Sequence, residues 1–167
     1  MEHREAGTFT DLYRHHAGAV YRFALYLSGD PSLAEDIVSE TFLRVWDSTV
    51  EVRMETVRGY LLAIARNLYL HERRRLRRQG TLEDCHLVEA TASRELEARE
   101  DLREALAILM KLPESSRAAL LLRAHEGLSY EEIARILGTS LSAVKVKIHR
   151  ARLSLAGHRK GADHASH

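Results

Sequence analysis

Arginine and lysine side chains are concentrated in two separate parts of the chain. Seven arginines lie between residues 58 and 79 with a single acid, and six basic residues lie between residues 144 and 160 with none. Guanidinium and ammonium groups bind phosphate oxygens without covalent chemistry. The formal net charge is only +1 because residues 30–55 and 83–104 are rich in acids. This segregation predicts an anionic partner that is contacted at two places.

The residue types that support covalent catalysis or metal binding form no recognisable arrangement in the sequence. The ten histidines lack the spacing of a zinc site, and Cys85 is the single cysteine. His15 and His16 are adjacent and therefore cannot share a helix face. There is also no serine–histidine–aspartate arrangement and no glycine-rich phosphate loop. We expect no enzymatic activity, no cofactor and no bound metal.

The composition also bears on the cellular compartment. One cysteine cannot form an internal disulfide, which fits a reducing compartment. Residues 1–10 lack the apolar core of a signal peptide, and no apolar run approaches membrane-spanning length. We expect a cytoplasmic protein without membrane insertion.

Apolar residues recur at three- and four-residue spacing along most of the chain, a pattern typical of amphipathic helices. Leu, Ala, Arg and Glu dominate and there are only two prolines, so we expect an all-α fold. The segment 81–93 is weakly periodic and divides the chain into two helical domains. We predict domains at 1–80 and 94–160, a linker at 81–93 and a tail at 161–167. Helices are expected at 9–27, 31–47, 57–78, 102–112, 116–125, 129–137 and 142–155, between a loose lead-in and a frayed tail that begins near residue 158.

The strongest motif is a helix-turn-helix at residues 129–152. Ser129 and Glu132 form a capping box, and Gly138 suits the left-handed end of the first helix. Ser140 or Ser142 caps the second helix. Its core-facing residues and its outward residues fall on opposite sides, as a recognition helix in the major groove requires. The inward set is Val144, Ile148, Ala151 and Leu155, and the outward set is Val146 and Arg150, flanked by Lys145, Lys147 and Arg152.

The helices expected at 31–47 and 57–78 each have two distinct faces. The first starts after Asp30 or at a competing box of Ser32 and Glu35. We predict that it buries Ala34, Ile37, Val38, Thr41, Phe42 and Val45 and exposes Asp36, Glu40, Leu43 and Asp47. In the second, we predict that Leu61, Ile64, Ala65 and Leu68 point inward, and that Arg66, Leu70, Arg73 and Arg77 line the opposite face with Asn67, Arg74 and Arg78 beside them.

With these motifs in place, the chain resembles the extracytoplasmic-function group of the sigma-70 superfamily over about residues 9–157. Residues 34–46 resemble the polymerase-binding helix of sigma region 2. Residues 58–67 with 73–75 resemble the helix that handles the promoter −10 element. Residues 112–117, 126–134 and 149–152 resemble region 4, which reads the −35 element. In this group region 3 is reduced to a linker, as segment 81–93 would be.

The resemblance implies an alternative sigma factor that brings core RNA polymerase to promoters. Its partners would be the β′ clamp helices and β flap of the polymerase, promoter DNA, and an anti-sigma factor that covers regions 2 and 4. The loop 48–56 resembles the segment that captures a flipped −10 base. The implied polymerase-binding residues are Asp36, Glu40, Leu43 and Trp46, with a place in the core as the other interpretation of Trp46. The implied −10 residues are Arg58, Tyr60, Arg66, Asn67, Arg73, Arg74 and Arg77. The implied −35 residues are Ser142, Lys145, Val146, Lys147, Arg150 and Arg152.

The chain departs from the family pattern at several positions. Tyr60 stands where tryptophan is common, although a tyrosine can also stack on a base. Ala143 replaces a frequent threonine. Val146 can contact a thymine methyl but cannot read a donor or acceptor. Two alternatives remain open from sequence: a stand-alone helix-turn-helix regulator, and a sigma mimic that sequesters another regulator.

Overall fold

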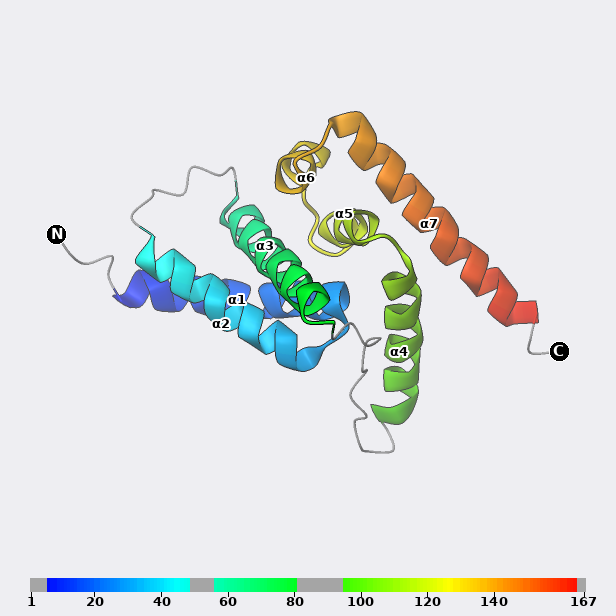
Figure 1. The fold of residues 1–167 in the computed structure, drawn as a ribbon, viewed down its shortest axis with the longest axis horizontal. Coiled ribbons are helices and arrows are strands. Elements are labelled where there is room, and N and C mark those ends of the chain that lie inside the picture. Colours follow the sequence, from blue (N-terminus) through cyan, green and yellow to red (C-terminus); the bar gives the residue numbers. More distant parts are fainter. Residues whose placement is uncertain (1–5, 49–55, 81–94, 165–167) are drawn as a thin grey trace. The chain divides into compact units, whose positions relative to one another are not determined.

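The computed structural model is shown in Figure 1 and describes residues 6–48, 56–80 and 95–164. Every regular element in these ranges is an α-helix, which confirms the all-α prediction. The chain forms two compact units, Met1–His86 and Leu87–His167. The segment predicted as a linker, with Cys85, and most of the loop predicted at 48–56 lie outside the described residues.

The first unit consists of three mutually packed helices, α1 (Ala6–Ser28), α2 (Pro31–Asp47) and α3 (Val57–Arg78). All six residues predicted for the inner stripe of α2 are buried. In α1 the buried residues cluster in the second half, around Phe23 and Leu27. Helix α1 begins at Ala6, so the loose lead-in predicted for residues 6–8 is wrong.

Local capping sets the start of both α2 and α3. The Asp30 carboxylate accepts hydrogen bonds from the backbone N–H groups of Ser32 (2.9 Å) and Leu33 (3.2 Å), so Asp30 is the cap of α2. Thr56 caps α3 by accepting from the Gly59 N–H at 3.1 Å. Gly80 lies just beyond the α3 cap with φ 67°, so α3 ends as predicted.

The second unit contains α4 (Glu95–Lys111), α5 (Glu114–Ala124), α6 (Tyr130–Leu137) and α7 (Leu141–His164). Helix α7 packs against α4, α5 and α6. Part of the core is formed by Leu112, Leu120 and Ala151, with Leu109 and Leu155 packed against them. Helix α7 continues to His164, so the frayed tail predicted from residue 158 is wrong for residues 158–164.

A buried arginine holds the junction between α4 and α5. Pro113 cannot continue a helix, so the last carbonyls of α4 need other donors. The Arg117 guanidinium, with only 2% of its surface exposed, supplies one. Its Nη1 donates to the carbonyl oxygens of Leu112 (2.9 Å) and Leu109 (3.4 Å). This arginine therefore supports the fold of the second unit from inside.

Candidate nucleic-acid and protein interfaces

Helices α6 and α7 form the predicted helix-turn-helix. Ser129 Oγ accepts from the Glu132 N–H at 3.2 Å, and Glu132 Oε2 accepts from the Ser129 N–H at 3.4 Å, which confirms the capping box. Gly138 ends α6 in the left-handed conformation, at φ 63°. At the start of α7, Ser140 Oγ accepts from the Ala143 N–H at 3.1 Å. Ser140 is therefore the cap, and Ser142 is left exposed in the first turn of α7.

The two sides of α7 are as predicted. Val144, Ile148 and Ala151 are buried. On the opposite side Val146 is 46% exposed and Arg150 is also exposed. A helix with one side packed and the other exposed can enter a DNA groove while its domain stays folded. The arrangement suits reading of base edges by these two residues.

The flanking cations of α7 differ in their surroundings. Arg152 is exposed, and Lys145 is exposed with its Nζ 5.9 Å from the centre of the Tyr130 ring. Lys147 is half-buried, and its Nζ donates to Ser115 Oγ on α5 at 3.0 Å. Its ammonium is therefore fixed against α5, a contact that the sequence analysis did not predict.

The Tyr130 ring also faces a second cation that the sequence analysis did not select. The Arg123 guanidinium carbon lies 4.5 Å from the ring centre. Its Nη1 donates to the carbonyl oxygen of Leu128 at 3.0 Å, which fixes the turn before α6. Arg123, Tyr130 and Lys145 come from three different helices, and their spacing in the sequence gives no signal of this contact.

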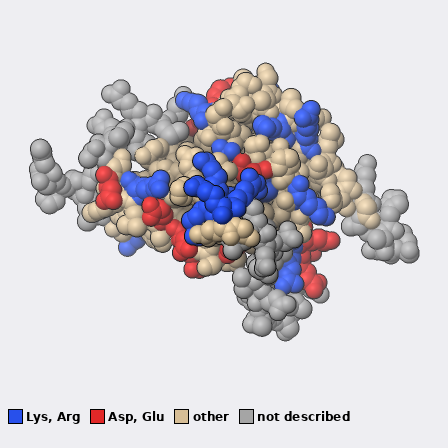
Figure 2. Space-filling view, viewed as in Figure 1, with Lys and Arg blue, Asp and Glu red and all other residues tan. Residues whose placement is uncertain are grey.

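The outward face of α2 is acidic with an exposed leucine at its centre, as predicted. Asp36, Glu40 and Asp47 are exposed, and Leu43 is 57% exposed. Arg44 Nε donates to Glu40 Oε1 at 3.2 Å, which partly neutralises one carboxylate. Figure 2 shows acidic side chains spread along α2, which contrasts with basic side chains gathered near the C-terminal end of α3.

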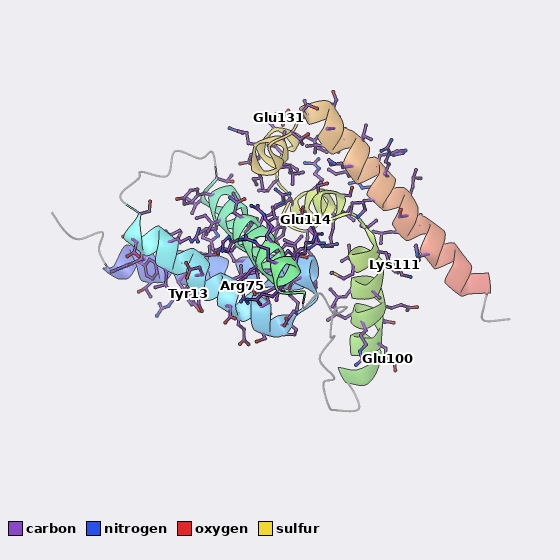
Figure 3. All side chains as sticks on the ribbon, in the orientation of Figure 1. Tyr13, Arg75, Glu100, Lys111, Glu114 and Glu131 are labelled. Atoms are coloured by element: carbon purple, nitrogen blue, oxygen red, sulfur yellow. The ribbon has the colours of Figure 1, made fainter. Side chains whose placement is uncertain are left out.

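Aromatic side chains border this face at the contact between α1 and α2. Trp46 is 53% exposed, and its ring centre lies 4.8 Å from that of Phe9 in an edge-to-face arrangement. Phe42 contacts both Phe9 (6.3 Å) and Tyr13 (4.9 Å), and Tyr13 is labelled in Figure 3. Trp46 is thus a surface residue with one side supported by α1, and the interpretation that placed it in the core is wrong.

The prediction that Arg66 lies on the exposed face of α3 is wrong. Arg66 is only 8% exposed and shares the buried stripe with Leu62 and Tyr69. Both α1 and α2 pack against α3. The observed buried stripe is therefore rotated about the helix axis from the predicted stripe, by somewhat less than the angle of about 100° between successive residues. The same rotation leaves Ile64 and Leu68 half-buried.

The exposed basic face of α3 is centred on other predicted residues. Tyr60, Asn67 and Arg74 recur every seven residues, so they lie on one side of the helix. Tyr60 is half-buried and the other two are exposed, as are Arg77 and Arg78.

Two further arginines of α3 are engaged by neighbours on the same helix. The Arg73 guanidinium carbon lies 5.9 Å from the centre of the Tyr69 ring. Arg75 donates to both carboxylate oxygens of Glu72, at 2.9 and 2.6 Å, and holds the pKa of Glu72 below its usual value. Arg75 is labelled in Figure 3. The face available to an anion is therefore narrower than the seven arginines of the sequence suggested, because Arg66 is buried and Arg75 is paired with Glu72.

The first turn of α3 lies close to a histidine of α1. Arg58 is exposed, and His16 is half-buried. Burial, then the positive charge of Arg58 and then His15, lower the pKa of His16 from its ordinary value. The buried Nδ1 of His16 has no hydrogen-bond partner within the described part of the chain. Protonation of this ring is therefore disfavoured in the folded unit.

The described residues contain no group of three or more histidine, cysteine, aspartate or glutamate side chains that could hold a metal ion. In the same residue ranges, no helix combines the length and the apolar character needed to cross a membrane.

Two family models match the chain, one on each unit. The model of sigma-70 region 2 matches residues 12–79, and the model of sigma-70 region 4 matches residues 102–155. The first therefore includes most of α1 and all of α2 and α3. The second includes the helix-turn-helix.

Characterised relatives and solved structures agree with these matches. The chain is 40% identical to the ECF RNA polymerase sigma factor SigE of Mycolicibacterium smegmatis, over 89% of this chain and 60% of the relative. It is 34% identical to the ECF sigma factor SigL of Mycobacterium tuberculosis, over 88% of this chain and 86% of the relative. The sigma factor RpoE of Bartonella quintana, solved in complex with the anti-sigma factor NepR, superposes with a TM-score of 0.76 at 27% identity, covering 92% of this chain and 97% of that one. The chain therefore belongs to the extracytoplasmic-function group of the sigma-70 family, as an RNA polymerase sigma factor that directs transcription initiation and is not itself an enzyme.

Proposed function

We propose that this sigma factor reads the −35 element with the outward face of α7 and the −10 element with the exposed face of α3. The observation that carries the proposal is the exposure of Val146 and Arg150 directly opposite a buried stripe. Arg150 can donate two hydrogen bonds to the O6 and N7 of a guanine, and Val146 can contact a thymine methyl. Ser142, Lys145 and Arg152 then hold the phosphates on either side.

Lys147 has a different place in this scheme. Its bond to Ser115 fixes the ammonium beside the N-terminus of α5. A phosphate that reaches this position meets a cation that has already lost part of its side-chain freedom. Lys147 thus contacts a DNA phosphate at the edge of the −35 surface with an ammonium group that is already held in place.

At the −10 element, the face of Tyr60, Asn67 and Arg74 meets the non-template strand. The arginines neutralise the backbone while the strands separate, and the Tyr60 ring stacks on an unpaired base. Arg58, Arg73 and Arg77 contact phosphates at the margins. Arg66 supports the helix from within, because its side chain is buried. The loop proposed to capture a flipped base lies outside the described residues.

The acidic face of α2 binds core polymerase. Asp36 and Glu40 pair with basic residues of the β′ clamp helices, and Leu43 and Trp46 supply the apolar anchors. The second unit contacts the β flap. Because these surfaces act only together with polymerase, we place the protein in the cytoplasm.

An anti-sigma factor regulates the protein. The support is that RpoE of Bartonella quintana was solved with NepR, and that a second similar structure is CnrH with the cytosolic domain of CnrY. The latter superposes with a TM-score of 0.73 at 26% identity, over 95% of this chain and 91% of that one. A partner that covers the exposed residues of α2 and α7 would block polymerase and DNA together.

Transcription with purified components tests the proposal. The protein is mixed with sigma-free core polymerase and fragments of its own genome, and the transcripts are sequenced. We expect discrete start sites that share one −35 and one −10 element, and we expect Arg150→Ala to relax the preference at one base pair of the −35 element. If starts are absent while the protein alone binds duplex DNA tightly, the promoter assignment is wrong.

A further inference from the structure

The contact of one tyrosine ring with two cations is the starting point. Tyr130 is the first residue of α6, and its ring faces Arg123 of α5 and Lys145 of α7 at 4.5 and 5.9 Å. A cation within about 6 Å of a ring centre is attracted by the negative face of the π-system. The ring therefore links all three helices that carry the −35 surface.

The two cations are not equivalent. Arg123 is half-buried and also bonded to the Leu128 carbonyl, so its guanidinium is fixed from two directions. Lys145 is exposed, and its ammonium lies at the outer limit of the attraction. Arg123 thus locks the ring from the side of α5, and the ring in turn limits where the longer and freer Lys145 side chain can go.

The positive charges of Arg123 and Lys145 also affect how this site interacts with an anion. Both charged centres lie close to one ring, so they repel each other and together attract an anion. A phosphate beside Lys145 would relieve this repulsion, because its negative charge attracts both cations. The ordering of Lys145 before DNA arrives reduces the conformational entropy that it loses on binding.

We propose that Tyr130 is a positioning residue for −35 binding: its ring, locked by Arg123, holds Lys145 where it meets a backbone phosphate. The inference rests on the proposed −35 role of α7 and adds a residue that acts through Lys145. The interacting group is the aromatic face and not the hydroxyl. The chemistry therefore predicts that phenylalanine can replace tyrosine at this position.

The test uses holoenzyme assembled from core polymerase and each full-length variant, with the promoter found by the transcription experiment. Promoter affinity is measured over a range of NaCl concentrations. We expect Tyr130→Leu to weaken binding on the order of fivefold and Tyr130→Phe to stay within about twofold of the parent. Lys145→Gln should cost little more in the Tyr130→Leu background, since the two changes remove one interaction. In the parent background, Lys145→Gln should also reduce the dependence of promoter affinity on salt concentration by the amount expected for about one phosphate contact.

A shape-matched variant separates this role from simple packing. Pentafluorophenylalanine at position 130 keeps the ring but reverses its quadrupole, and it should weaken promoter binding as Tyr130→Leu does, although it fills the space of a phenylalanine. The inference is overturned if the fluorinated ring binds as phenylalanine does, if Tyr130→Phe is as weak as Tyr130→Leu, or if the Tyr130 and Lys145 losses add. If the parent holoenzyme gives no specific start sites, the proposed function fails first, so the two failures are distinguishable.

Discussion

Helices α2 and α7 each bury one stripe of apolar residues and expose an aliphatic side chain at the centre of the opposite face. Leu43 and Val146 are these side chains, 57% and 46% exposed. Their surroundings differ in two respects: α2 surrounds Leu43 with carboxylates and large aromatics, whereas α7 surrounds Val146 with cations. The same helical design therefore suits a protein partner on α2 and nucleic acid on α7.

The sizes of the exposed apolar side chains on the two helices, Trp46 on α2 and Val146 on α7, support this division. Protein interfaces obtain much of their binding energy from large anchors such as tryptophan, inside a ring of polar residues. Base edges offer only small apolar targets, chiefly the thymine methyl. Trp46 with its Phe9 support fits the first case, and an isolated valine between Lys145 and Lys147 fits the second.

Trp46→Ala should have the largest effect, and it should weaken only the binding of core polymerase by α2. As an interfacial anchor, the indole would be worth about 2 kcal/mol or more, or about 30-fold in the Kd for core polymerase. The affinity is measured by competition between labelled parent and unlabelled variants. Val57→Ala removes another exposed apolar side chain from the same unit and serves as the matched control. Equal losses in the two variants would contradict an anchor role for Trp46.

Arg150→Ala should weaken promoter binding by α7 and leave the affinity for core polymerase unchanged. The loss of a bidentate contact to guanine costs about 1–3 kcal/mol and relaxes preference at one base pair. The measurement compares holoenzyme binding to the cognate promoter and to a promoter changed at each −35 position in turn. Arg103→Ala removes the same charge from an exposed site on α4. A loss that is uniform over all −35 variants would show that Arg150 contacts phosphate and not a base.

Sequence periodicity predicted the elements more accurately than the environment of single side chains. The bounds of α3 agree because Thr56 and Gly80 are local signals. The burial of Arg66 was missed because it depends on how two other helices cover α3. A contact such as that of Lys147 with Ser115 joins residues 32 positions apart, and helical spacing carries no information about it.

Val146→Ala should have a smaller effect that sharpens the interpretation of α7. If the valine contacts a thymine methyl, the loss should be about 1 kcal/mol, in line with burial of one or two methyl groups. Replacement of that thymine by deoxyuracil in the promoter removes the DNA methyl group from the same contact. The parent should then bind no better than the variant, because either change removes the same contact. A full additional loss in the variant on deoxyuracil DNA would contradict the methyl contact.

The smallest expected effect is a pH dependence confined to the unit that carries the acidic face. The pKa of His16 is lowered in the folded unit, so the unfolded chain binds the extra proton more readily. Stability that is present above the ordinary pKa near 6.5 should therefore decrease as the pH falls through it. The single tryptophan lies in this unit, so its fluorescence can follow urea unfolding at pH 7.5 and 5.5. His16→Gln should show a smaller loss between the two pH values than the parent, whereas His149→Gln, on the exposed side of α7, should not. If both variants keep the parental pH dependence, protonation of His16 is not coupled to the packing of α1 against α3, and the pH response originates elsewhere in the unit.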